Sequence, residues 1–203
     1  MRFGQHAPAL GEPNGPAERV AALDTDPSFL AFLLGCGAVR RSRLRAVVQR
    51  VSWAEVEVEG SVRGRIDQGL IVLLGISETD GEDDADFMAR KLMGLRVFSD
   101  DAGKMNLAVT DLSPTGAVLM VPNFTVCGNT RKGRRPSYVD AAGPEKGEAL
   151  FELVCERIAA AAVPTARGVF GAHMHCRLEN DGPVTVIVES PNGRTGPGSA
   201  SDE

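Results

Sequence analysis

Hydrophobic and polar residues alternate strictly over residues 54–58 and again over residues 62–66, which predicts two strands that each carry one apolar face. Their pairing must bring the apolar faces together, because a slip of one residue turns every side chain to the other side. A three-residue loop, Glu59-Gly60-Ser61, meets this condition. Oppositely charged residues then face each other and favour the register, and the expected pairs are Glu57 with Arg63 and Glu55 with Arg65.

Longer patterns predict a central strand and two helices. Residues 70–74 are apolar at every position, as in a strand that is buried on both faces. A helix is expected over residues 82–95, with Thr79 or Asp80 as its N-cap and an apolar stripe at Ala85, Met88, Ala89 and Leu92. A second helix begins at Pro144 and has apolar positions at Leu150, Leu153, Val154, Ile158 and Ala161.

The order of these elements predicts the fold class. Four strand-like runs come before the first helix, which excludes a doubly wound parallel sheet. The sequence therefore predicts an α+β fold, built from a largely antiparallel sheet or a partial barrel with two main helices.

Composition narrows the class of protein. The 203 residues suit one domain with short additions, and no apolar run approaches the ~18 residues of a membrane span. The net charge of −5 argues against a generally basic surface, so contact with RNA would need a local patch. Four cysteines without a Cys-x-x-Cys pair indicate reduced thiols, and we expect a cytoplasmic protein.

Both ends of the chain differ in composition from the middle. Residues 1–43 are predicted to be a poorly ordered extension, which an upstream start codon assigned in error would explain. Residues 44–190 are predicted to form the folded domain. Residues 191–203 are rich in Gly, Pro, Ser and Asp and are predicted to be a disordered tail.

The most informative stretch covers residues 121–138. A strand ends at Pro122, which lacks an N–H for the sheet, and Asn123, Phe124 and Thr125 follow. Four cations then occur within five residues, at Arg131, Lys132, Arg134 and Arg135. This pattern suits an anionic ligand held over a backbone-lined site, and it also suits a hairpin corner with a solvated basic loop.

Other residues leave several kinds of chemistry open. Thr125 and Ser137 are candidate nucleophiles, but no histidine is close in sequence and no Gly-x-Ser-x-Gly motif occurs. Gly182 would let a ligand approach the main chain, and Pro183 permits a cis peptide bond. His173 and His175 share one strand face, which would allow a zinc pair, although no third ligand suggests itself and solvent-exposed histidines are the better explanation.

Short motifs in the same order resemble the D-aminoacyl-tRNA deacylases, also called D-tyrosyl-tRNA deacylases. The likeness runs from about Leu44 to Ser190 and rests on these segments: Ala46-Val-Val-Gln-Arg-Val51, Gly103-Lys-Met-Asn-Leu107, Asn123-Phe-Thr-Val126, Gly133-Arg-Arg-Pro-Ser137, Gly168-Val-Phe-Gly-Ala172 and Asn180-Asp-Gly-Pro-Val-Thr185. Each segment alone is weak evidence, whereas the ordered set is specific.

The resemblance implies an enzyme of translation quality control. Such an enzyme cleaves the ester between a D-amino acid and tRNA, works as a homodimer with sites at the subunit interface, and needs no metal or other cofactor. Gly182 and Pro183 would form a Gly–cis-Pro element that enters the partner's site and rejects L-amino acids. Phe124 would position the terminal adenosine, and the main-chain N–H of Phe124 or Thr125 would face the oxyanion.

Two residues depart from the family pattern, which usually reads Ser-Gln-Phe-Thr-Leu. Pro122 replaces Ser, and Asn123 replaces Gln and is one methylene shorter. A shifted substrate such as glycyl-tRNA therefore stays open. Two other hypotheses also stay open: a tRNA-binding relative that has lost catalysis, and a metal hydrolase that uses His173, His175 and a distant carboxylate.

Overall fold

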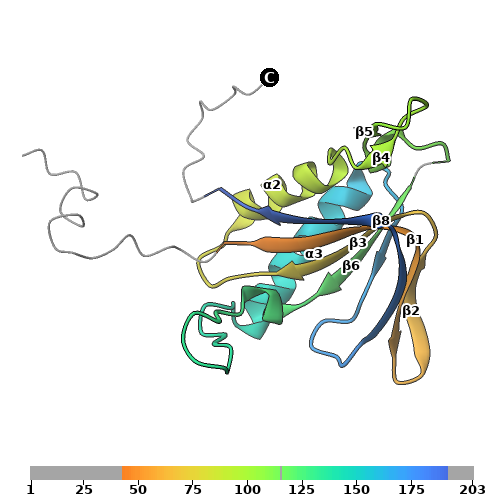
Figure 1. Cartoon of the computed structure of the whole chain (residues 1–203). Helices are drawn as coiled ribbons and strands as arrows, with labels where there is room; N and C mark the ends of the chain where they lie inside the picture. The colour runs from red at the N-terminus through yellow and green to blue at the C-terminus, as the bar shows by residue number, and fades with distance from the viewer. Residues whose placement is uncertain (1–42, 115, 192–203) are drawn as a thin grey trace, which may run out of the picture. The chain divides into compact units, whose positions relative to one another are not determined.

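The computed structural model of the chain describes residues 43–114 and 116–191, so the predicted extension and tail lie almost wholly outside the described residues. The elements are, in order, β1 (Arg45–Val58), β2 (Ser61–Ile66), β3 (Gly69–Gly75), α2 (Glu82–Met93), β4 (Phe98–Ser99), β5 (Met105–Leu107), η2 (Val109–Asp111), β6 (Ala117–Pro122), η3 (Phe124–Cys127), α3 (Pro144–Ala160), β7 (Thr165–Arg167) and β8 (His175–Glu189). Figure 1 shows their arrangement.

A six-stranded mixed sheet forms the centre of the fold. Its strands follow the order β2-β1-β3-β6-β7, and β8 also pairs with β1. The three pairs made by β1 are antiparallel, whereas β6 is parallel to both β3 and β7. The prediction of an α+β fold with two helices is confirmed. The prediction of a largely antiparallel sheet is only partly correct, because β6 forms two parallel pairs. The helices α2 and α3 each provide the long crossover that a parallel pair requires.

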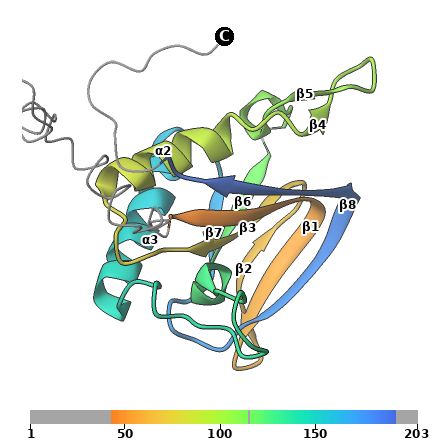
Figure 2. The same cartoon turned by 60° about the vertical axis from the view of Figure 1, so that its left-hand side comes forward.

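Both helices cover one face of the sheet (Figures 1 and 2). The buried positions of α2 are those that the sequence predicts, and Leu150, Val154 and Ile158 of α3 are buried as expected. They join Ala46 and Val48 of β1 in the larger of two apolar clusters. Each buried Val, Leu, Ile or Met side chain in this cluster contributes about 1.5–3 kcal/mol when it is removed from water. Within the described ranges, no helix is long and apolar enough to cross a membrane.

A second apolar cluster lies on the opposite face of the sheet, where the sheet curls into a nearly closed barrel. Val51, Ala54 and Val56 of β1 contribute to it. Gly64 of β2 makes the closure possible, because an added Cβ would lie 2.8 Å from the Arg167 carbonyl oxygen of β7. Strands at the two ends of the sheet path therefore approach each other closely.

A bulge within β1 changes which residues of the strand face each side of the sheet. The register with β8 shifts between Val51 and Trp53, which oppose Asn180 and Glu179, so Ser52 is an extra residue. Even-numbered residues therefore lie on one face of the sheet before this bulge and on the other face after it. The two halves of β1 consequently serve different apolar clusters.

The β1–β2 hairpin corrects one prediction. Glu55 faces Arg65 as expected, but Glu57 faces Val62 rather than Arg63, and Val58 faces Ser61. The turn contains two residues, Glu59 and Gly60, both with positive φ, as in the tight turns that suit a twisted hairpin. Arg63 is a bulged extra residue, which lets a two-residue turn keep the apolar faces together.

The start of α2 corrects another prediction. Gly81 is the N-cap, and its N–H donates to the Asp84 carboxylate at 3.0 Å. Asp80 instead points inward and accepts hydrogen bonds from the N–H groups of Leu44 (2.9 Å) and Ser77 (2.6 Å). Burial raises the pKa of Asp80. This carboxyl group ties the entry of β1 to the loop that precedes α2.

Candidate active site

The turn Asn123–Cys127 begins where β6 ends. The Asn123 N–H donates to the Leu74 carbonyl of β3 at 2.8 Å, which continues the sheet for one residue beyond Pro122. Asn123 is the N-cap of η3, and its side-chain Oδ1 accepts from the Thr125 N–H at 3.1 Å. The turn is thus fixed at its start by both the main chain and the side chain of Asn123.

The same carboxamide oxygen also accepts a hydrogen bond from the Thr125 hydroxyl. The next N–H, that of Val126, donates to the Asn123 carbonyl at 3.2 Å. In residues 43–114 and 116–191 we find no acceptor for the N–H of Phe124. Of the two main-chain donors that the resemblance implies for an oxyanion, Phe124 is therefore the available one, because the Thr125 N–H is already engaged.

Packing beneath the turn sets its position on the sheet. A Cβ at Gly75 would lie 2.9 Å from Cys127 Sγ and 3.2 Å from the Asn123 carbonyl oxygen, so Gly75 allows the turn to rest on the end of β3. Arg45 at the start of β1 donates to the Val126 carbonyl at 3.4 Å. Its guanidinium is held in turn by Glu189, at 2.6 Å.

Cys127 is a half-buried free thiol beside this turn. Burial is the main cause that raises the pKa of its thiol to about 11, and the charge of Asp80 acts in the same direction. A thiol with this pKa is neutral at pH 7 and a poor nucleophile. The interpretation of Cys127 as a small packing residue agrees with its surroundings.

An exposed aromatic pair lies next to the turn. The Phe124 side chain is 59% exposed, and its ring meets the Tyr138 ring edge to face, with centroids 5.2 Å apart. Tyr138 follows a loop that two hydrogen bonds between Asn129 and Ser137 close at its base. The loop and the turn therefore share one surface.

The four predicted cations all lie on this loop and are exposed; they are Arg131, Lys132, Arg134 and Arg135. In the described part of the chain, none of the four side chains forms an ion pair. Unpaired, closely spaced cations attract an anionic ligand such as a phosphate chain.

The segment Asn180–Val184 forms a bulge in β8. Thr185 faces Gln49 and Asn180 faces Val51, so the four intervening residues oppose only Arg50. The Gly182–Pro183 peptide bond is cis, as the family resemblance implies, and both residues are exposed. Gly182 has φ of +140°, and a Cβ there would meet the Val184 nitrogen at 2.8 Å.

Side chains on either side brace this bulge. Arg50 donates from Nε to the Asp181 carbonyl at 2.9 Å and from Nη1 to the Val97 carbonyl at 2.6 Å. Asn180 Oδ1 accepts from the Val184 N–H at 2.8 Å. Main-chain atoms of Gly182 and Pro183 are thereby presented on a rigid support.

The turn and the bulge do not meet within one chain. The turn is next to Leu74, which pairs with Ala46, whereas the bulge opposes Arg50. Four residues along β1 and three strand spacings across the sheet correspond to roughly 20 Å. Figures 1 and 2 likewise show η3 and the bend of β8 at separate ends of the sheet.

The two histidines lie elsewhere, on the approach to β8 and at its first residue. The rings of His173 and His175 are 5.0 Å apart, and both side chains are exposed. Within the described residues, no group of three or more His, Cys, Asp and Glu side chains is arranged to hold a metal.

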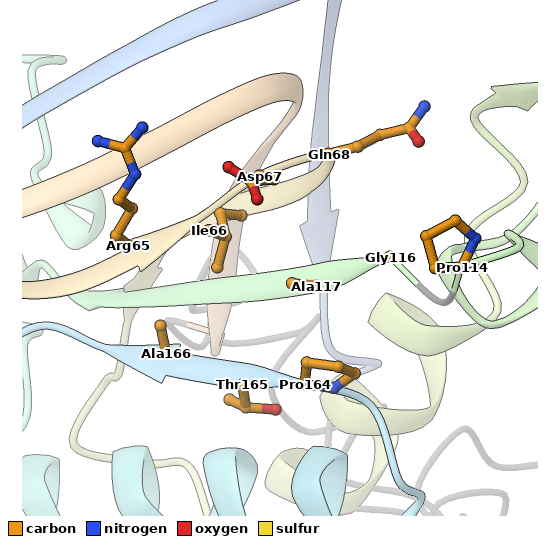
Figure 3. A pocket seen from close by; sticks show the side chains of 10 residues that line it. All are labelled: Arg65, Ile66, Asp67, Gln68, Pro114, Gly116, Ala117, Pro164, Thr165 and Ala166. Carbon is orange, nitrogen blue, oxygen red and sulfur yellow. The ribbon is translucent and has the colours of Figure 1, made fainter.

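A cavity of about 420 Å³ opens at the beginning of β6, at the other end of this strand from the turn (Figure 3). The charged and polar side chains that line it include Arg65, Asp67, Gln68 and Thr165. None of the residues that the sequence singles out for binding or catalysis lines this cavity. The candidate site therefore lies apart from this cavity.

Comparison with known proteins assigns the family. Residues 47–189 match the model of the family described as D-Tyr-tRNA(Tyr) deacylase. The D-aminoacyl-tRNA deacylase of Anaeromyxobacter dehalogenans is 52% identical over 147 residues, which cover 72% of this chain and 97% of the relative. The enzyme of the same name from Geobacter metallireducens is 48% identical over 153 residues, which cover 75% of this chain and 100% of the relative. The chain therefore belongs to the D-Tyr-tRNA(Tyr) deacylase family, which is a family of hydrolases.

Two solved structures are similar to this chain in fold. One, named c-Myc DNA Unwinding Element Binding Protein, has a TM-score of 0.68 and 38% identity, and the match covers 72% of this chain and 99% of that one. Another, named as a probable eukaryotic D-amino acid tRNA deacylase, has a TM-score of 0.61 over the same shares of the two chains. Its identity of 17% supports the fold alone.

The state of Cys127 can be measured directly. At pH 8 only about one thiol in a thousand would be ionised if the pKa is about 11, so we expect slow alkylation by iodoacetamide. The rate should rise about tenfold per pH unit up to pH 10, whereas the unfolded chain should approach its maximum near pH 9. Peptide mass spectrometry resolves Cys127 from the other cysteines. Fast labelling of the folded protein that levels off below pH 9 would contradict the assignment.

Proposed function

We propose that this chain hydrolyses the ester bond of D-aminoacyl-tRNA and releases the free D-amino acid and tRNA. The observation that carries the proposal is the exposed, side-chain-capped turn at Asn123–Cys127, with an available Phe124 N–H, beside four exposed cations. This arrangement occurs in a chain that covers 97% of a D-aminoacyl-tRNA deacylase at 52% identity. Such a substrate exists in the cytoplasm, where we expect the enzyme to act.

In the proposed mechanism, the main chain stabilises the transition state. Water attacks the ester carbonyl, the Phe124 N–H donates to the oxyanion, and the ribose oxygen leaves with a proton. A single preorganised donor of this kind contributes about 10²–10³ in rate in a well-studied protease. An aminoacyl ester is already activated, so oxyanion stabilisation and a placed water supply much of what the reaction needs.

Thr125 has a secondary role in this mechanism. Its hydroxyl donates to the Asn123 carboxamide, and a carboxamide oxygen is too weak a base to remove the proton from a nucleophile. Asn123 instead orients the turn, so that the Phe124 N–H points away from the cap. In this proposal the neighbouring 2′-hydroxyl of the terminal ribose acts as the catalytic group in place of a protein base.

A second copy of the chain completes the site. Roughly 20 Å separates the turn from the Gly182–Pro183 bulge in one chain, which is too far for both to contact one aminoacyl group. A row of apolar side chains crosses the outer face of the sheet at Leu73, Val47 and Ile187, and Ile187 is 64% exposed. This row supports a homodimer, since an exposed apolar row commonly marks an interface.

The bulge would reject L-amino acids by exclusion. Main-chain atoms at Gly182 and Pro183, held by Arg50 and Asn180, would occupy the space that the side chain of an L-amino acid needs. Exclusion of this kind does not reject glycine, which has no side chain. We therefore propose that glycyl-tRNA is also a substrate.

The alternative is a tRNA-binding protein that has lost catalysis. The departures at Pro122 and Asn123 favour it, since they alter the segment that leads into the turn. The capped geometry of Asn123 argues that the shorter side chain still fixes the turn.

Deacylation assays separate these hypotheses. We expect the protein to release D-tyrosine from D-Tyr-tRNA and glycine from Gly-tRNA, to leave L-Tyr-tRNA intact, and to retain full activity with EDTA. A His173→Gln, His175→Gln variant should behave like the wild type. Binding of tRNA without turnover would favour the binding protein, and loss of turnover with EDTA would favour a metal hydrolase.

Subunit complementation tests the shared site. Asn123→Ala removes the cap of the turn, and Gly182→Ala forces the bulge to shift because of its contact with Val184, so each variant should lose at least tenfold in turnover of D-Tyr-tRNA. After subunit exchange in an equal mixture, half of the dimers contain both variants and one of their two sites is intact. Turnover should therefore return to about a quarter of the wild-type value. Native mass spectrometry that finds mixed dimers without recovered activity would contradict a shared site.

Salt dependence tests the role of the basic loop. An Arg134→Ala, Arg135→Ala variant should bind tRNA more weakly and should lower the slope of log K against log salt by about 1.4–1.8, as expected for two lost phosphate contacts. Arg63→Ala, Arg90→Ala is a matched control, because it removes two exposed arginines from β2 and α2. An unchanged slope in the loop variant would indicate that these arginines do not contact phosphates.

A further inference from the structure

Tyr138 has no role in the function proposed above, yet its ring lies against the residue expected to meet the terminal nucleoside. The Phe124 and Tyr138 rings are 5.2 Å apart at their centroids and inclined at 76°. Both rings are exposed, at 59% and 38% of their surface. Two large aromatic side chains that stay in contact with water at one spot are a common feature of ligand-binding surfaces.

The surroundings hold the Tyr138 ring in place. A Cβ at Gly128 would lie 2.9 Å from Tyr138 Cε1, so the ring packs directly on the main chain after η3. The two Asn129–Ser137 hydrogen bonds, of 2.8 and 2.9 Å, fix the residue just before Tyr138. The Tyr138 carbonyl accepts from the Ala141 N–H at 3.0 Å, which fixes the residues after it.

Because the Phe124 and Tyr138 rings are nearly perpendicular, together they form a corner between two aromatic surfaces. A planar base that stacks on the more exposed ring, Phe124, meets the Tyr138 ring with its own edge. The four loop cations are carried by the chain that leads into Tyr138, so phosphates and base would be bound by adjacent parts of one surface. A basic groove combined with an aromatic stacking surface is the usual way in which proteins bind single-stranded nucleic acid.

We propose that Tyr138 contacts the terminal base of the acylated RNA and forms, together with Phe124, an aromatic corner that fits a purine. This inference rests on the proposed function, because it identifies what recognises the nucleic-acid part of that substrate. The corner selects an ester carried by RNA over the same ester on a small alcohol. It also favours adenine over a pyrimidine at the 3′ end, since a larger base covers more of both rings.

A double-mutant cycle, in which Tyr138 and the terminal base of the RNA are changed separately and together, tests the contact. Tyr138→Leu should raise KM for D-Tyr-tRNA about tenfold and leave kcat nearly unchanged, as expected for the loss of one base–aromatic contact. Tyr138→Phe keeps the ring and should resemble the wild type. On a substrate whose terminal adenine is replaced by an abasic site, Tyr138→Leu and wild type should have equal KM values.

A purely structural role gives a different result. If Tyr138 only supports Phe124 and the turn, Tyr138→Leu reduces activity equally on the adenine-ended and the abasic substrate, and this outcome overturns the proposal. A change in oligomeric state of Tyr138→Leu, measured by light scattering, would show that a second copy covers the ring, and it too overturns the proposal.

Fluorescence tests the contact without turnover. Tyr138 is the single tyrosine of the chain and Trp53 the single tryptophan, so Trp53→Phe leaves Tyr138 as the dominant emitter. Trp53 lies on β1 with Arg65 over its ring at 5.7 Å, outside the candidate site. We expect the trinucleotide CCA to quench tyrosine emission with saturation, and CC ending in an abasic site to quench it at least fivefold more weakly.

The two readouts also separate this inference from the proposed function. Saturable quenching by CCA in a protein that does not deacylate D-Tyr-tRNA would support the aromatic corner and reject the enzymatic activity. Turnover of D-Tyr-tRNA with equal quenching by both oligonucleotides would support the activity and reject the role of Tyr138.

Discussion

The hydrogen-bonded ladder of β1 sets the distance between the turn at Asn123–Cys127 and the Gly182–Pro183 bulge. Over 14 residues this strand pairs with β2, β3 and β8. Its first residue, Arg45, supports the turn at Val126, and Arg50 supports the bulge at Asp181. Because a paired strand cannot shorten, the two main-chain elements stay about 20 Å apart in one chain. A site that uses both elements requires two chains, so dimerisation would be part of the chemistry.

The turn itself depends on a single carboxamide. Asn123 engages both donors of Thr125, which leaves the Phe124 N–H as the available main-chain donor of the two. The half-buried Cys127 behind the turn is kept neutral by its surroundings, with its pKa raised to about 11. The site therefore offers a fixed dipole rather than a charged nucleophile, which suits the hydrolysis of an activated ester whose RNA carries its own hydroxyl group.

Sequence reasoning predicted the elements of this fold better than their connections. A period of two located β1 and β2, and unbroken hydrophobicity located the central β3. The parallel pairing of β6 was missed, because strand direction depends on the helical crossovers and not on the alternation of residues. The bulge at Arg63 was missed because charge complementarity favoured a longer loop. The sequence singled out the turn, the loop and the Gly–Pro pair as candidates, but it did not predict the cap that Asn123 forms with Thr125. Tyr138 was also passed over, although an aromatic residue after a basic run is itself a signal.

The bend in the middle of the sheet couples the lengths of β1 and β8. β1 gains Ser52, and β8 gains three residues around Gly182, so in both strands the even-numbered residues pass from one face of the sheet to the other at nearly the same level. A deletion in either strand alone would turn the hydrophobic side chains of one half toward water, while the other half stayed correct. Changes in length are therefore tolerated only as compensating pairs. The packing of the core on both sides of the bend therefore fixes the place of the exposed Gly–Pro segment along β8.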